Sequence, residues 1–142
     1  ETLKHTDPHV RAWTVRLLGD ESVVTEPLAK RLAHLAKREP HIEVRSQLAA
    51  TAKRLPSNQA LLIIRSLMEH DADSGDIYQP LMVWWALESK LNRNAGNVLD
   101  FFEDESLWQK SLVRQHLLSR LLRRFAKAGT GADMLKSARL FE

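Results

Sequence analysis

The chain has 142 residues, 44% of them apolar and 27% charged, which is the balance of one globular domain with a continuous core. It contains no cysteine, so disulfides, thiolate metal sites, cysteine nucleophiles and C-x-x-C-H haem attachment are excluded from this sequence. The formal net charge of +3 permits contact with nucleic acid or anionic lipid without requiring it, and no apolar run approaches the roughly 20 residues of a membrane span.

Two helices are predicted in the first 40 residues. Asp7 and Pro8 begin the first, because Asp accepts a hydrogen bond from an unpaired backbone N–H and Pro is tolerated at the first helical position. Gly19 ends it, and the second helix begins near Thr25 and stops at Pro40. Each has an apolar face, formed by Val10, Trp13, Leu17 and Leu18 in the first and by Leu28, Leu32, Leu35 and Ala36 in the second.

The next two helices follow the same scheme. One includes Val44 and Leu55 and is stopped by Pro56, and Ser57 is expected to cap the other. The second of these is apolar nearly all round at residues 61–64, so we expect it to be sandwiched between neighbours.

A third pair is predicted after a polar break. Pro80 begins a helix that extends to Leu91, and the residues at 94–97 predict a turn. A short partner helix is expected at 98–102.

The last part of the chain is predicted to contain the longest helix. Ser106 and Gln109 have the spacing of a capping box, and apolar residues from 107 to 125 continue in register behind them. A final helix is expected to close the array, with its apolar residues at Met134, Ala138 and Phe141.

A short motif recurs near the start of successive helices. It occurs as Val10-Arg11, Val44-Arg45 and Val113-Arg114, with a degenerate Leu81-Met82 between them, at offsets of 34, 37 and 32 residues. Self-similarity at about 30–47 residues without a strand pattern is typical of stacked helix pairs. We therefore predict an all-α fold, an α-solenoid of about four stacked antiparallel helix pairs in a right-handed superhelix. The predicted single domain spans 1–142, with repeats at roughly 5–38, 40–70, 77–103 and 105–141.

The motif D-P-x-V-R followed by L-L-G, present at residues 7–11 and 17–19, resembles a HEAT repeat. In HEAT repeats the Arg after the Val lies in a ladder with acidic residues between repeats. Arg11, Arg45 and Arg114 match that position. Met82 replaces the Arg in the third repeat, so the resemblance implies an interrupted ladder there.

A narrower resemblance covers nearly the whole chain. It is carried by the runs at 10–20, 32–36, 44–49, 54–56 and 80–88, of which Pro-Leu-Met-Val-Trp-Trp-Ala-Leu-Glu is the most specific. Their order resembles the HEAT segment of large bacterial membrane-bound dehydrogenase-like proteins, between a β-propeller and a cytochrome c domain. Ser89 stands where that pattern has Pro. The resemblance implies an exported location, periplasmic or cell-surface, and a parent oxidoreductase whose catalytic residues and cofactors lie outside this segment. Residues 1–5 contain no initiator Met and no signal peptide, so we expect a fragment or a processed product.

Tryptophans and arginines are the candidate interaction residues. Adjacent Trp84 and Trp85 point about 100° apart on a helix, so one is expected in the core and one on a surface. Trp13 is expected in the core. A basic stripe on the last long helix could follow a phosphate backbone or form a solvated helix face; it includes Arg120, Arg123 and Arg124.

The metal-like patterns in the sequence are weak. Asp71, Asp73 and Asp76 faintly resemble a calcium loop, but Met82 stands where a bidentate Glu is required, so we interpret them as a solvated loop. The six histidines include no H-E-x-x-H pair. We predict no catalytic, cofactor-binding or metal residue in this segment.

These features predict a non-catalytic HEAT-like scaffold or protein-interaction domain within a larger exported dehydrogenase-like protein. Its expected partners are neighbouring domains of the same chain or another protein. The alternative is a nucleic-acid-binding HEAT-like protein of the DNA glycosylase type, which the basic last helix favours and the modest net charge disfavours. A third interpretation is a protein-interaction module without any link to redox chemistry.

Overall fold

The computed structural model describes residues 2–128 and residue 138, and this part of the chain is all-α. The prediction of an all-helical fold is confirmed. Its elements, in chain order, are η1 (Thr2–Lys4), α1 (Pro8–Leu18), α2 (Glu26–Arg38), α3 (Ile42–Arg54), α4 (Ser57–Leu67), η2 (Asp71–Gly75), α5 (Gln79–Phe102), η3 (Glu105–Gln109), the π-helical η4 (Val113–Leu117) and α6 (Leu118–Ala128).

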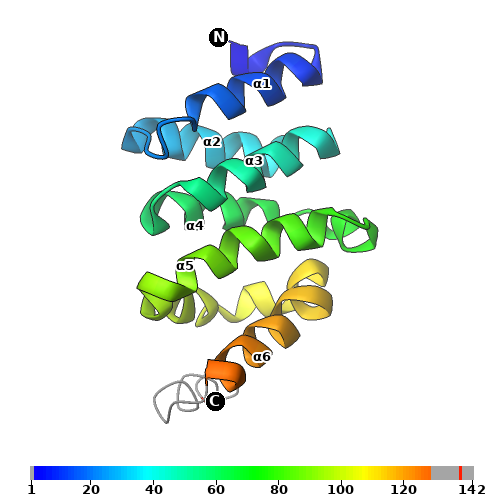
Figure 1. Ribbon diagram of the computed structural model, residues 1–142. Helices are drawn as coiled ribbons and strands as arrows, with labels where there is room; N and C mark the ends of the chain where they lie inside the picture. Colours follow the sequence, from blue (N-terminus) through cyan, green and yellow to red (C-terminus); the bar gives the residue numbers. More distant parts are fainter. Residues whose placement is uncertain (1, 129–137, 139–142) are drawn as a thin grey trace.

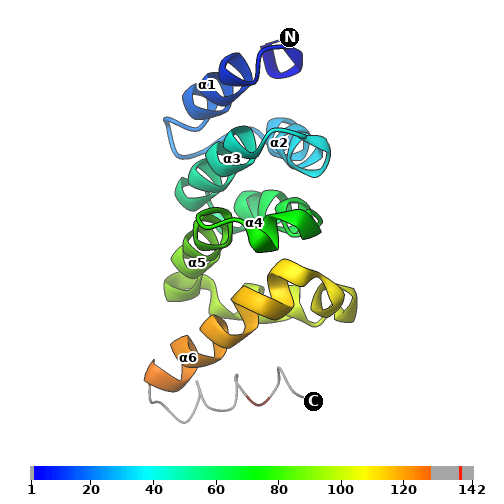
Figure 2. The same ribbon diagram turned by 90° about the vertical axis from the view of Figure 1, so that its right-hand side faces the viewer.

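The helices lie in two columns along one axis (Figures 1 and 2). In one column α1 packs on α3 and α3 packs on α5, while in the other α2 packs on α4. The columns are joined because α4 also contacts α3 and α5. The segments η1 and α6 lie at opposite ends of the stack.

The core runs between the columns, and α4 is its centre. Ala60, Ile63, Ile64 and Leu67 are fully buried, because α4 has α2, α3 and α5 around it. This confirms the expected sandwiched helix, although Leu62 on the remaining side stays 40% exposed.

The predicted signals at both ends of α1 are present. The Asp7 carboxylate accepts a hydrogen bond from the His9 backbone N–H at 2.8 Å, and Pro8 occupies the first helical position. At the other end α1 approaches α3 closely, since a Cβ on Gly19 would lie 2.4 Å from Thr51 Cγ2. A glycine is therefore required at this contact.

The expected turn at 94–97 does not form, and one continuous α5 replaces the predicted pair of helices. Gly96 costs only about 1 kcal/mol in a helix interior. Leu91, Val98 and Phe102 are buried at intervals that continue one helical face, so burial outweighs this cost. As a result α5, with 24 residues, is the longest described helix, and the prediction that the helix from Ser106 through Phe125 is the longest is wrong.

The capping box at Ser106 and Gln109 does not start a long helix either. Asp104 acts as the cap instead, accepting hydrogen bonds from the backbone N–H of Ser106 at 3.0 Å and from its hydroxyl at 2.6 Å. The result is the short 3₁₀ segment η3, after which the helix restarts as η4 and α6. The predicted closing helix falls, apart from Ala138, outside the described residues.

No described helix combines the length and hydropathy that crossing a membrane requires.

Candidate interaction surface

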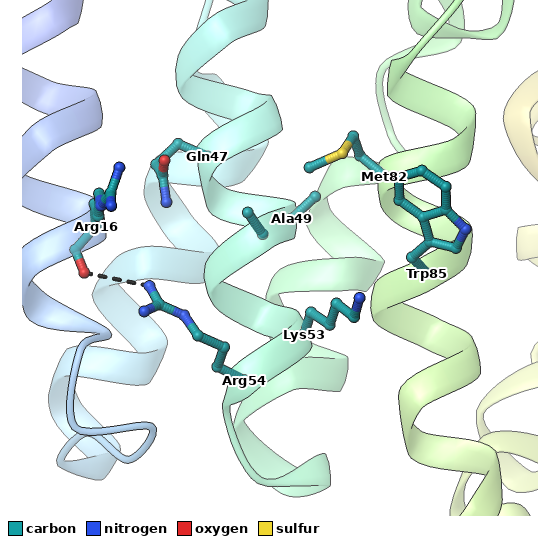
Figure 3. A pocket seen from close by; sticks show the side chains of 8 residues that line it. Arg16, Gln47, Ala49, Lys53, Arg54, Met82 and Trp85 are labelled. Carbon is teal, nitrogen blue, oxygen red and sulfur yellow. Dashed lines mark hydrogen bonds between the residues drawn. The ribbon is translucent and has the colours of Figure 1, made fainter.

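A hollow of about 640 Å³ crosses α1, α3 and α5 on the side where neither α2 nor α4 contributes a residue (Figure 3). We call it the outer groove. Its lining residues are Arg16 from α1, Gln47, Ala49, Ala50, Lys53 and Arg54 from α3, and Met82 and Trp85 from α5.

The paired tryptophans of α5 separate as the helical geometry predicts. Trp84 is 6% exposed and packs in the core, whereas Trp85 is 45% exposed and forms one wall of the outer groove. Trp13 is 60% exposed, so the expectation that it lies in the core is wrong. It lies nearly opposite the buried Val15 around α1, and Leu17 beside it is also exposed.

Two cations of the groove lie against these exposed rings. The Arg16 guanidinium carbon is 5.2 Å from the centroid of the Trp13 ring, and Lys53 Nζ is 5.9 Å from that of Trp85. Such cation–π contacts stabilise by about 0.5–1 kcal/mol at exposed sites. Neither Arg16 nor Lys53 pairs with a carboxylate of the described residues, so both charges are available at the surface.

The third groove cation is already paired. Arg54 donates to the Asp20 carboxylate at 3.1 Å and to the Arg16 carbonyl oxygen at 3.4 Å (Figure 3). It thereby links the end of α3 to the end of α1, and its charge is partly neutralised.

A smaller hollow of about 180 Å³ continues the outer groove toward α6, with Lys53 and Trp85 lining both. Arg124 reaches it from α6, where it donates to Asn92 Oδ1 at 2.8 Å and lies 3.9 Å from Glu88.

The other predicted interaction residues lie outside both hollows. Arg123 turns back along α6 and donates to the Ser119 carbonyl oxygen at 3.1 Å, and Arg120 is half-buried. The structure thus brings together Trp85 and Arg124 but leaves Trp84, Arg120 and Arg123 elsewhere.

A second feature, which we call the arginine ladder, joins successive layers of the stack. Arg11 donates to both Glu39 oxygens at 2.9 and 2.6 Å, and Arg45 donates to both Asp73 oxygens at 2.8 and 2.5 Å. In each pair the acid follows the arginine by 28 residues. Arg114 is exposed and forms no ion pair with a described residue, so two of the three predicted arginines form rungs.

Glu39 connects the two rungs. Its backbone carbonyl accepts a hydrogen bond from Arg45 at 2.9 Å, and its carboxylate also accepts one from the His41 backbone N–H at 3.0 Å. The hydrogen bond that Arg11 donates to the Glu39 carboxylate raises the pKa of Arg11. The rungs therefore form one continuous network across α1, α3 and η2.

Sequence analysis did not identify the acidic partners of the ladder. Asp73 is 2% exposed and ion-paired, so the expectation of a solvated loop at 71–76 is wrong for Asp73, although Asp71 and Gly75 are exposed. Asp71 accepts a hydrogen bond from the Ser111 backbone N–H at 3.0 Å, and Asp76 caps α5 through the N–H of Tyr78 and Gln79. An acid repeated 28 residues after each ladder arginine is the signal that could have identified Glu39 and Asp73.

Lys90 is a further buried cation that the sequence did not single out. It is 6% exposed and donates to the carbonyl oxygens of Lys53 at 3.0 Å and Leu55 at 2.5 Å, at the C-terminal end of α3. Burial lowers the pKa of Lys90 to about 8. The C-terminal ends of α1 and α3 are thus each capped by a cation from the next helix of the column.

Two histidines, His70 and His116, form hydrogen bonds between layers of the stack. A ring nitrogen of His70 lies 2.7 Å from the Ala36 carbonyl oxygen, and one of His116 lies 2.8 Å from that of Ser74. No cluster of three or more His, Cys, Asp or Glu suited to a metal occurs within residues 2–128.

No family model, curated protein or solved structure matches the chain.

Proposed function

We propose that the chain is a HEAT-like α-solenoid of stacked antiparallel helix pairs that serves as a non-catalytic scaffold for proteins. Such a scaffold places two protein segments at a fixed spacing and offers a long surface to a partner. The two-column packing of α1 to α5 supports this arrangement.

The observation that carries the proposal is the arginine ladder. Two bidentate Arg–carboxylate pairs with the same 28-residue spacing join successive layers, and Glu39 couples them. Bidentate pairs fix orientation as well as distance, because two guanidinium nitrogens donate to the two oxygens of one carboxylate. The ladder thus holds α1, α3 and η2 in a fixed relative geometry.

We further propose that this scaffold belongs to a larger exported dehydrogenase-like protein. The support is the resemblance of the sequence runs, above all the one at 80–88. The coding DNA on both sides of the segment tests it. An upstream export signal with a propeller-like stretch and a downstream C-x-x-C-H motif are expected, and unrelated flanking sequence would contradict the placement.

The scaffold role is tested by measuring distances between spin labels. The chain has no cysteine, so Leu17→Cys with Lys127→Cys places labels only on α1 and α6. Pulsed electron paramagnetic resonance should give one narrow distance distribution for this pair. The reference is Glu26→Cys with Lys37→Cys, in which both labels lie on the single helix α2. A distribution much broader than the reference would contradict a rigid scaffold.

A further inference from the structure

The outer groove combines an apolar floor with a purely cationic set of charged residues. Its charged lining residues are Arg16, Lys53 and Arg54, and no carboxylate lines it. Ala50 and Met82 supply apolar surface, and the Trp85 ring stands at one side. A ligand complementary to this lining has negative charges around an apolar side chain.

We propose that the outer groove binds an acidic segment of a partner protein, with one large apolar side chain seated between Met82 and Trp85. The inference rests on the proposed scaffold function and specifies the chemistry of the partner. Carboxylates of the segment pair with Arg16 and Lys53, the two groove cations that no described carboxylate neutralises.

The dimensions of the groove suit a short extended peptide. Packed helices lie about 8–10 Å apart, so a path from α1 across α3 to α5 covers about 20 Å. An extended chain advances about 3.3 Å per residue, so about six residues cross the groove. Met82 is an adaptable wall, because its unbranched thioether side chain takes several shapes at little cost.

Charge and apolar lining favour a polypeptide over a nucleic acid. A phosphate backbone needs a row of unpaired cations, but Arg54 and Arg124 are committed to Asp20 and to Asn92 and Glu88. Two free cations beside an apolar floor match a segment in which acidic residues flank an apolar side chain.

The test uses synthetic octapeptides carrying a dye without net charge. The first has three acidic residues on either side of a central Leu-Phe; in the second Asn and Gln replace the acids; in the third Gly-Ser replaces the centre. A 20-nucleotide single-stranded DNA is the competing class. Fluorescence anisotropy at low and high salt measures binding to the unmodified chain and to its variants.

We expect the first peptide to bind at least about tenfold more tightly than the other two and than the DNA. The double variant Arg16→Glu/Lys53→Glu should weaken binding about tenfold or more, since it reverses both free charges. Trp85→Ala should weaken it without changing the salt dependence. The matched control is Lys37→Glu/Arg38→Glu, which reverses two exposed charges at the end of α2 away from the groove, and it should leave binding unchanged.

Three results would overturn the inference. They are absence of binding by the acidic peptide, equal binding by the groove variants and the control, and tighter binding of the DNA. Thermal melting of each variant establishes that it is folded. The spin-label distances separate the two proposals, because a narrow distribution without peptide binding refutes only the acidic partner.

Discussion

The first and last layers of the stack are joined by different chemistry. In the first layers the two ladder pairs, Arg11–Glu39 and Arg45–Asp73, are bidentate and almost excluded from water, with the Arg45 and Asp73 side chains 9% and 2% exposed. At the last layer the ion pairs of the described residues are Arg65–Asp104, Lys110–Glu69 and Arg124–Glu88, and all six side chains are at least 28% exposed. Exposed pairs contribute little to stability, typically about 0–1 kcal/mol.

This difference follows the sequence repeat. The ladder arginine is present in the first two repeats, and each of those layers has the predicted helix boundaries to within about two residues. Met82 replaces it in α5, and there the single long helix, the 3₁₀ segment η3 and the π-helical η4 appear instead. The regular part of the stack is thus the part that keeps the ladder.

The largest expected effect is the loss of a ladder rung. Arg45→Met leaves the Asp73 carboxylate buried without its partner, which should cost about 3–5 kcal/mol of the free energy of unfolding in a urea titration followed by circular dichroism. The matched control Arg65→Met removes a half-exposed pair and should cost less than about 1 kcal/mol. Adding Asp73→Leu to Arg45→Met should recover most of the loss. Equal losses for Arg45→Met and Arg65→Met would contradict the comparison.

The buried Lys90 should make stability depend on pH. Its pKa is about 8 in the folded chain and 10.5 when free, so between these values the unfolded state binds more protons. The free energy of unfolding should therefore rise as the pH increases from 8 to 10.5, by as much as about 3 kcal/mol. In Lys90→Met this rise should disappear. An identical pH profile for both chains, measured by urea titration, would show that Lys90 is not the titrating group.

Two glycines provide a smaller contrast between the regions. Gly19→Ala should cost about 1–3 kcal/mol, because its Cβ would lie 2.4 Å from Thr51 Cγ2 in the tight α1–α3 contact. Gly96→Ala in α5 should instead stabilise by about 0.5–1 kcal/mol, since nothing lies within 4 Å of its added Cβ. Adding Thr51→Ser, which lacks Cγ2, should recover part of the Gly19→Ala loss. A Gly19→Ala melting temperature equal to that of the unmodified chain would contradict this contact.

The sequence predicts the helix ends of the first layers better than those of the last layers. Pro8 and Gly19 mark helix ends correctly because their effect is local. Ser57, expected to cap its helix, is instead the first helical residue of α4, and Pro56 occupies the N-cap. The turn expected at 94–97 failed because burial of Val98 and Phe102 in the core outweighs the cost of one helical glycine. The ladder arginines were found through the repeated Val-Arg motif, but Glu39 and Asp73 are 28 residues away and carry no local mark.

The exposure of Trp13 was not predicted for a related reason. Trp13 is large and apolar and lies in a stripe with Val10 and Leu17, so helical spacing alone places it in the core. In the stack, α1 has neighbours on only part of its circumference, and Trp13 and Leu17 lie nearly opposite the buried Val15. Which face of an amphipathic helix stays uncovered depends on how many neighbours pack on it, and this information is not local.

The smallest expected effect concerns acid stability at the last layer. Hydrogen bonds from Ser106, with a further one from Arg65, lower the pKa of Asp104 to about 2, against 3.8 for a free side chain. As the pH falls, Asp104 is protonated in the unfolded chain before it is protonated in the folded one. Its contribution to the free energy of unfolding is therefore fully present above about pH 4 and is lost as the pH falls through 2. Asp104→Asn should therefore lower the melting temperature slightly at pH 7 but not at pH 2. A decrease of the same size at both pH values would mean that the charge of Asp104 is not what stabilises η3. The segment η3 takes the place of the start of the predicted long helix, and no ladder pair stabilises it. This experiment therefore also tests whether the exposed cap Asp104 stabilises the 3₁₀ conformation of η3.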